Sequence, residues 1–183
     1  MVETDERTAI WLISGGRGAG KTTLCGHVAD LARRADWDVA GILSPARVEN
    51  GDKTGIFVQD LRRRESRLLA SAKKDEATGM HTCRWTFSEA ALHWANEALA
   101  GSVPCDLLVI DEIGPLELEQ EKGLVAWRGV LRSKLYRIAL AVVRPELEQL
   151  FREEWRHSPS LVIDSPGQAM TLAQTFAFDL IQR

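Results

Sequence analysis

The chain has 183 residues, of which 45% are hydrophobic and 27% charged, an ordinary composition for a globular protein with one sizeable core. Its formal net charge of −3 gives no general attraction to nucleic acid, and Arg62, Arg63 and Arg64 form the only evident basic cluster. No stretch has the length or the flanks of a membrane span or signal peptide, so we expect a cytoplasmic protein with no membrane partner. Since the sequence contains no repeat or linker, we expect residues 1–183 to form a single domain.

The first forty residues predict a strand, a helix and a second strand. Thr8–Ser14 is a short apolar run that ends in glycines, as a buried strand does. Lys21–Arg34 has apolar residues at helical spacing, and Val39–Leu43 is another apolar run. This order predicts a βαβ unit, and therefore a parallel sheet.

The next segment, about residues 47–87, predicts an inserted antiparallel hairpin beside the parallel sheet. Asn50–Asp52 reads Asn-Gly-Asp, a strong turn signal, and Gly55–Leu61 alternates as a half-exposed strand does. Ser66–Ala70 and Thr82–Phe87 are further short extended candidates.

The second half of the chain alternates helical patterns with apolar runs. Ser88 is a candidate N-cap, and Leu107–Ile110 is the most apolar strand of the chain. The expected helices are Glu89–Leu99, about Glu119–Leu135, Pro145 to about Arg156, and Gln168–Ile181. The expected strands are Leu107–Ile110, Ile138–Val143 and Leu161–Ile163.

The glycine-rich segment after the first strand carries the strongest motif. Gly15, Gly20, Lys21 and Thr22 match G-x-x-x-x-G-K-[ST], the Walker A or P-loop pattern, in its expected place between strand and helix. Backbone N–H groups in such a loop surround phosphate oxygens, Lys21 reaches the β- and γ-phosphates, and the Thr22 hydroxyl binds magnesium. The motif and the strand pattern predict an α/β, three-layer P-loop NTPase fold with a mainly parallel sheet flanked by helices. The candidate nucleotide-binding residues are Gly15, Gly16, Arg17, Gly18, Ala19, Gly20, Lys21, Thr22 and Thr23.

Two acidic residues follow the most apolar strand. Asp111 stands where a Walker B carboxylate would join Thr22 at Mg²⁺, and Glu112 is a candidate general base for water in line with the γ-phosphorus. A strand-end acid is otherwise a turn or cap residue, but the P-loop favours the metal interpretation. Arg144 ends the strand Ile138–Val143 and is either an internal arginine finger or γ-phosphate sensor, or a solvated arginine. Arg47 is a further candidate to face the phosphates.

Three segments, GGRGAGKTTL, AGILSPARVENGDKTGIFVQDL and LLVIDEIGPLEL, together resemble the small P-loop nucleoside-triphosphatase family of the cancer-related nucleoside triphosphatase type. The resemblance covers about Ile10–Val143 and implies magnesium-dependent hydrolysis of ATP, GTP and other nucleoside triphosphates. Lys21, Thr22, Asp111 and Glu112 match the family's motif positions. The family's Asn-Arg pair for the base is missing from the region VIDSPGQAM, where Ser165–Gln168 is a candidate substitute.

Other interpretations stay open. A nucleotide or small-molecule kinase would use the inserted hairpin as its acceptor site, and a nucleotide-dependent regulator or adaptor would bind a protein partner there. Cys25, just after the P-loop, is either a reactive thiol or a helix-packing residue. Trp85 is a candidate contact for a base or substrate, with core packing as the plainer alternative.

Overall fold

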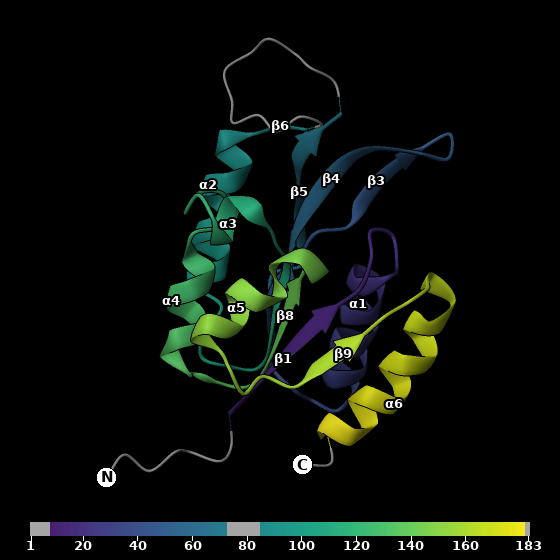
Figure 1. The fold of residues 1–183 in the computed structure, drawn as a ribbon, viewed down its shortest axis with the longest axis vertical. Helices are drawn as coiled ribbons and strands as arrows, with labels where there is room; N and C mark the ends of the chain where they lie inside the picture. The colour runs from purple at the N-terminus through teal and green to yellow at the C-terminus, as the bar shows by residue number, and fades with distance from the viewer. Residues whose placement is uncertain (1–7, 73–84, 182–183) are drawn as a thin grey trace.

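The fold alternates strands and helices along most of the chain (Figure 1). The computed structural model describes residues 8–72 and 85–181. The strands are β1 (Ala9–Ser14), β2 (Val39–Leu43), β3 (Ala46–Glu49), β4 (Asp52–Asp60), β5 (Glu65–Ser71), β6 (Thr86–Phe87), β7 (Cys105–Ile113), β8 (Tyr136–Val143) and β9 (Ser160–Val162). The helices are α1 (Lys21–Arg34), α2 (Glu89–Ala100), α3 (Pro115–Leu118), α4 (Ala126–Ser133), α5 (Glu148–Glu154) and α6 (Ala169–Ile181), with 3₁₀ turns at Pro145–Leu147 and Pro166–Gln168.

The strands form one mixed sheet in the order β6-β5-β4-β2-β7-β8-β1-β9, with β3 paired to β4. Strands β2, β7, β8, β1 and β9 are mutually parallel, whereas β4 joins β2 antiparallel through the pairs Ile42–Asp60 and Leu43–Gln59. The inserted segment is therefore antiparallel, as predicted, and it extends the parallel sheet. Strand β8 lies between β1 and β7, which brings three strand ends to one edge of the sheet.

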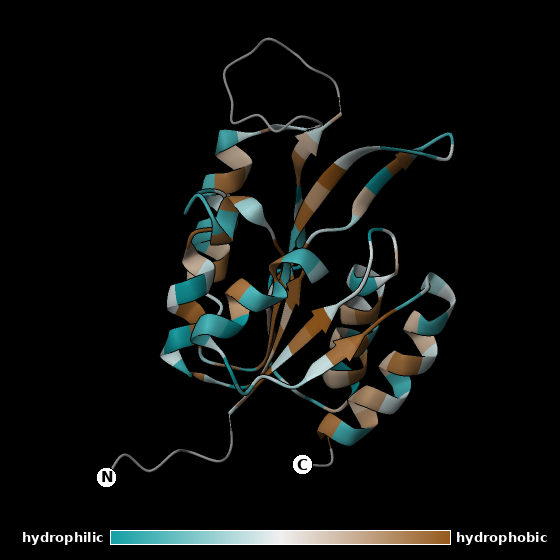
Figure 2. Ribbon diagram, viewed as in Figure 1, coloured by the Kyte–Doolittle hydropathy of each residue, from teal (hydrophilic) through white to brown (hydrophobic). Residues whose placement is uncertain are grey.

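The middle residues of the central strands, Leu107–Ile110 of β7 and Ile138–Val143 of β8, are apolar because helices cover both faces of the sheet. Along β7, Leu108 and Ile110 belong to one buried cluster with α2, α4 and α5, while Leu107 and Val109 belong to another with α1 and α6. This period of two is the strand repeat. Figure 1 shows the two helical layers, and Figure 2 shows hydrophobic strands between them. The predicted three-layer α/β fold is confirmed.

The inserted hairpin begins with the predicted Asn-Gly turn. Asn50 and Gly51 have φ values of 52° and 87°, and the flanking Glu49 and Asp52 form a cross-strand pair. Two left-handed residues in a two-residue loop are typical of a type I′ turn. The strand predicted at Thr82–Phe87 corresponds at its end to β6, and the first three residues of that prediction lie outside the described residues.

One predicted helix, Glu119–Leu135, is wrong. Of this segment, only Ala126–Ser133 is helical, as α4, because α3 already ends at Leu118. Between α3 and α4 the chain makes a turn in which Glu121 and Gly123 adopt φ values of 52° and 73°. Left-handed residues end a right-handed helix, so the apolar spacing does not continue through this turn. Elsewhere, Ser88 caps α2 as predicted, accepting a hydrogen bond from the Ala91 N–H at 3.2 Å. No helix within the described ranges is long and apolar enough to cross a membrane.

Cys25 lies on α1 and is fully buried, and burial raises the pKa of its thiol well above the usual value. Since the thiolate is the reactive form, this environment favours the packing role over the reactive one. Cys105, at the start of β7, also has a pKa raised by burial, to about 12. Both thiols are free.

Candidate active site

The loop between β1 and α1 depends on glycines with left-handed backbone. Gly15, Gly18 and Gly20 have φ values of 146°, 76° and 99°, which L side chains rarely adopt. A Cβ on Gly15 would lie 2.2 Å from the Ile163 carbonyl oxygen, so the residue that follows β9 packs directly against the loop. The loop then opens α1, whose first N–H groups have no partner within the helix. This is the geometry of an anion site at a helix N-terminus.

Lys21 lies across its own loop. Its Nζ donates hydrogen bonds to the carbonyl oxygens of Gly15 at 2.6 Å and Gly16 at 2.8 Å. Burial lowers the pKa of Lys21, while the nearby carboxylates of Glu112 and Asp111 raise it. The structure thus brings the P-loop lysine into the electrostatic neighbourhood of both predicted acidic residues.

Asp111 is the most deeply buried acid of the site, with 1% of its surface exposed. Its Oδ2 accepts a hydrogen bond from the Ser44 N–H at 2.8 Å, and the Ser44 hydroxyl donates to its backbone oxygen. Burial raises the pKa of Asp111 to about 6, an effect opposed by the Ser44 N–H and, more weakly, by the nearby Thr22 side chain and Lys21.

The other carboxylate oxygen of Asp111, Oδ1, is buried and has no hydrogen-bond partner among residues 8–72 and 85–181. A buried carboxylate oxygen left free beside a threonine hydroxyl fits a hard cation such as Mg²⁺. Across residues 8–72 and 85–181, no group of three or more His, Cys, Asp or Glu side chains could hold a metal. Thr22 and Asp111 each offer one oxygen, which suits a metal whose remaining ligands come from phosphates and water.

Glu112 lies in a β-bulge with unusual backbone geometry. Ile110 pairs with Ala141 of β8, and Ile113 pairs with Val143. Two residues of β7, Asp111 and Glu112, therefore lie opposite a single residue of β8. Glu112 also has a φ of 69°, rare for a residue with a side chain. A bulge of this kind re-aims side chains and recurs beside functional sites.

Arg144 reaches Glu112 from the end of β8. Its Nη2 lies 2.9 Å from Glu112 Oε1, and the side chains of Arg144 and Glu112 remain 34% and 37% exposed. Because β8 separates β1 from β7, Arg144 emerges between the P-loop and the acidic pair. The predicted emergence of Arg144 and Asp111 at the same edge of the sheet is confirmed.

Other residues of this edge were not anticipated. The Ser14 hydroxyl, buried at the end of β1, donates a short hydrogen bond to Glu148 at the start of α5. Ser44 follows β2 directly, and only this position at the end of a strand could have indicated from the sequence that Ser44 belongs to the site. Glu148 carried no signal, because 134 positions separate it from Ser14.

Several candidates lie apart from this group or at its border. Arg47, on β3, forms an ion pair with Glu49 at 2.5 Å, which accounts for it without phosphate. Arg17 is exposed on the P-loop. Trp85 packs partly buried against the core cluster on the α2 side, so packing accounts for it. Pro166 lies beside the P-loop, because a Cβ added to Gly20 would be 3.1 Å from the Pro166 Cα.

The sequence matches the family described as NTPase over residues 11–164. The chain belongs to this family. It is 31% identical to the nucleoside-triphosphatase THEP1 of Methanothermobacter thermautotrophicus over 148 residues, 78% of this chain and 81% of the relative. It is also 31% identical to THEP1 of Methanopyrus kandleri over 118 residues, which cover 64% of each chain.

The fold is shared with a solved structure. The solution structure of a human cancer-related nucleoside triphosphatase superimposes with a TM-score of 0.68 at 18% identity, covering 94% of this chain and 97% of that one. The family match and the THEP1 relatives confirm the family resemblance carried by the P-loop and the DEIGPLEL segment.

Proposed function

We propose that this chain is a magnesium-dependent nucleoside triphosphatase that hydrolyses ATP, GTP and other nucleoside 5′-triphosphates to the diphosphate and phosphate. The observation that carries this proposal is the placement of Glu112, beside Asp111 and close to Lys21, at the strand edge that also holds the P-loop. The family and the names of the THEP1 relatives support the same activity. A cytoplasmic, single-domain protein remains our expectation for residues 1–183.

The P-loop holds the triphosphate. Backbone N–H groups from Gly15 to Thr23 surround phosphate oxygens, and the N-terminus of α1 adds a favourable dipole. The ammonium group of Lys21 exchanges its carbonyl partners for the β- and γ-phosphates. Arg17, exposed on the loop, belongs to the same nucleotide-binding set.

Thr22 and Asp111 hold the magnesium ion. The free Asp111 Oδ1 and the nearby Thr22 hydroxyl supply protein oxygens there. The bound ion would neutralise charge on the β- and γ-phosphates and orient them. Ser44 positions the Asp111 carboxylate through its N–H.

Glu112 activates the attacking water. Its carboxylate takes a proton from a water molecule placed in line with the γ-phosphorus, a role that a kinase with a bound acceptor does not generally require. Arg144 stabilises the negative charge that develops on the transferred group. Because Arg144 contacts Glu112 directly, the base and the cation lie within reach of the same reacting centre.

The nucleobase of the triphosphate has a candidate contact site beside the P-loop. Pro166 packs beside Gly20, so the segment Ser165–Gln168 borders the P-loop and is our candidate for contact with the base. This segment offers no Asn-Arg pair, which favours broad use of nucleotides over selection of one.

Hydrolysis in water enriched in ¹⁸O tests the reaction directly. The proposal predicts that phosphate released from ATP or GTP carries one ¹⁸O atom and that the diphosphate carries none, because water attacks the γ-phosphorus. Transfer of labelled γ-phosphate to an added acceptor, with little free phosphate, would instead establish a kinase. Tight nucleotide binding without turnover would favour the regulator or adaptor.

A further inference from the structure

The turn that follows Glu112 is organised around one buried carboxylate, Glu117. Its Oε2 accepts a hydrogen bond from the Gly114 N–H at 3.0 Å, and its Oε1 accepts another from the Leu124 N–H at 3.1 Å. Only 8% of Glu117 is exposed. One side chain therefore links the end of β7, two residues after Glu112, to the segment that leads into α4.

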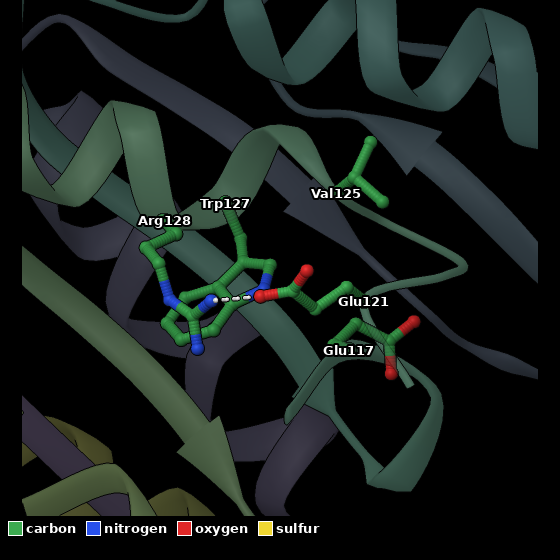
Figure 3. A pocket seen from close by; sticks show the side chains of 5 residues that line it. All are labelled: Glu117, Glu121, Val125, Trp127 and Arg128. Carbon is green, nitrogen blue, oxygen red and sulfur yellow. Dashed lines mark hydrogen bonds and ion pairs between the residues drawn. The ribbon is translucent and has the colours of Figure 1, made fainter. Parts of the chain in front are cut away.

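Glu117 is held by the backbone rather than by a cation. None of the ion pairs within the described ranges includes Glu117, whereas the neighbouring Glu121 pairs with Arg128 at 3.3 Å. Figure 3 shows both acids beside a pocket of about 260 Å³, with Glu121 reaching toward Arg128. Burial raises the pKa of Glu117, and the N–H groups of Leu124 and Gly114 oppose this shift. The two N–H groups compensate for the burial of the carboxylate, so Glu117 ties the backbone at Gly114 to the backbone at Leu124.

The surrounding turn fits closely around this carboxylate. Gly123 has a φ of 73°, and a Cβ there would lie 2.1 Å from Glu117 Oε1. A Cβ on Gly114 would likewise lie only 3.3 Å from Oε2. The two glycines let the backbone approach the carboxylate from both sides, which limits the positions that Gly114 can take.

Glu112 needs such support, because a left-handed backbone at a residue with a side chain persists only where its surroundings impose it. The β7–β8 ladder fixes Ile110 before the bulge and Ile113 after it. We infer that Glu117 is a positioning residue for hydrolysis: by fixing Gly114, it holds Glu112 in the orientation that water activation requires. This inference rests on the proposed role of Glu112 as the base.

Kinetics of three variants test the inference. Glu117→Ala removes both acceptors and is expected to lower kcat by about 10- to 100-fold, since a displacement of about 1 Å at a reacting group has effects of this size. Glu117→Gln keeps one acceptor and should lose less. In both variants KM should stay within about twofold, because the P-loop is unchanged. Glu119→Gln, an exposed acid at the end of the same helix, is the matched control and should behave as wild type.

A double-variant comparison separates positioning from general damage. If Glu117 acts through Glu112, adding Glu117→Ala to Glu112→Gln should change the residual kcat by less than about twofold, with rates normalised to folded protein. An equally large loss in the Glu112→Gln background, or an unchanged kcat in both single variants, would overturn the inference. Hydrolysis by Glu112→Gln at the wild-type rate would instead refute the proposed base.

Discussion

Arg144 Nη2 lies 2.9 Å from Glu112 Oε1, so the candidate cation and the candidate base form an ion pair. The pair is one-third exposed, and such pairs contribute little to stability because water screens them. A γ-phosphate offers Arg144 a second, more highly charged partner. We expect nucleotide binding to draw Arg144 toward the phosphate and leave Glu112 free to accept a proton.

Replacement of Arg144 by Ala should therefore lower kcat far more than it weakens binding. Loss of one preorganised donor to a transition-state oxyanion lowers rates by about 100- to 1,000-fold. Phosphate release and nucleotide titration measure the two effects separately. The control is Arg132→Ala, which removes an exposed arginine of α4 that pairs with Glu154 of α5. This variant should leave kcat and nucleotide affinity unchanged. An unchanged kcat in Arg144→Ala would return Arg144 to the role of a solvated arginine.

Local signals predicted much of this fold and of the candidate site. The P-loop strand and helix, the Asn50–Gly51 turn and the Ser88 cap all depend on residues close together in the sequence. The placement of Asp111 after an apolar strand was visible for the same reason. Parallel pairing then brings strand ends to one edge, and for this reason Arg144 could be expected near Asp111.

The details that local signals missed depend on distant partners. The bulge at Asp111 and Glu112 exists only in the register with β8, and Ser44 reaches Asp111 across 67 positions. The helix predicted over Glu119–Leu135 failed because the Glu117 carboxylate holds the Leu124 N–H in a turn. Apolar spacing alone does not reveal that contact.

Lys21→Ala should weaken triphosphate binding by about 100-fold or more. Hydrogen bonds to charged groups contribute about 1.5–3 kcal/mol each, and Lys21 is expected to make two with the phosphates. Calorimetric titration with a non-hydrolysable ATP analogue measures the loss. Lys122→Ala, on the exposed turn before α4, serves as the control. Wild-type affinity in Lys21→Ala would contradict the phosphate site itself.

Removal of magnesium with EDTA should abolish turnover, and added Mg²⁺ should restore it. In Asp111→Asn the Mg²⁺ concentration that gives half the maximal rate should rise at least about tenfold, since a neutral amide replaces a charged oxygen ligand. Asp179→Asn, an exposed acid on α6, should not shift this concentration. Full activity in EDTA would exclude the proposed metal requirement.

Two glycine substitutions should have opposite effects on stability. Gly15→Ala places a Cβ 2.2 Å from the Ile163 carbonyl oxygen in a left-handed residue, and should destabilise the fold by about 3 kcal/mol or more. At Gly129 in α4 an added Cβ would meet no described atom within 4 Å outside the backbone of its own helix, so Gly129→Ala should stabilise the fold by about 0.5–1 kcal/mol. Urea unfolding measures both. Equal stability of the two variants would contradict the packing of Ile163 against the P-loop.

The most direct measurement is the rate of phosphate release by Glu112→Gln, compared with wild type at saturating Mg²⁺ and ATP. Gln has nearly the same shape as Glu but cannot accept the proton, so kcat should fall by about 100-fold or more while ATP affinity stays within about threefold. Glu119→Gln, the exposed acid in the same segment, should hydrolyse ATP at the wild-type rate. Normal ATP binding together with wild-type turnover in Glu112→Gln would show that Glu112 does not activate the water.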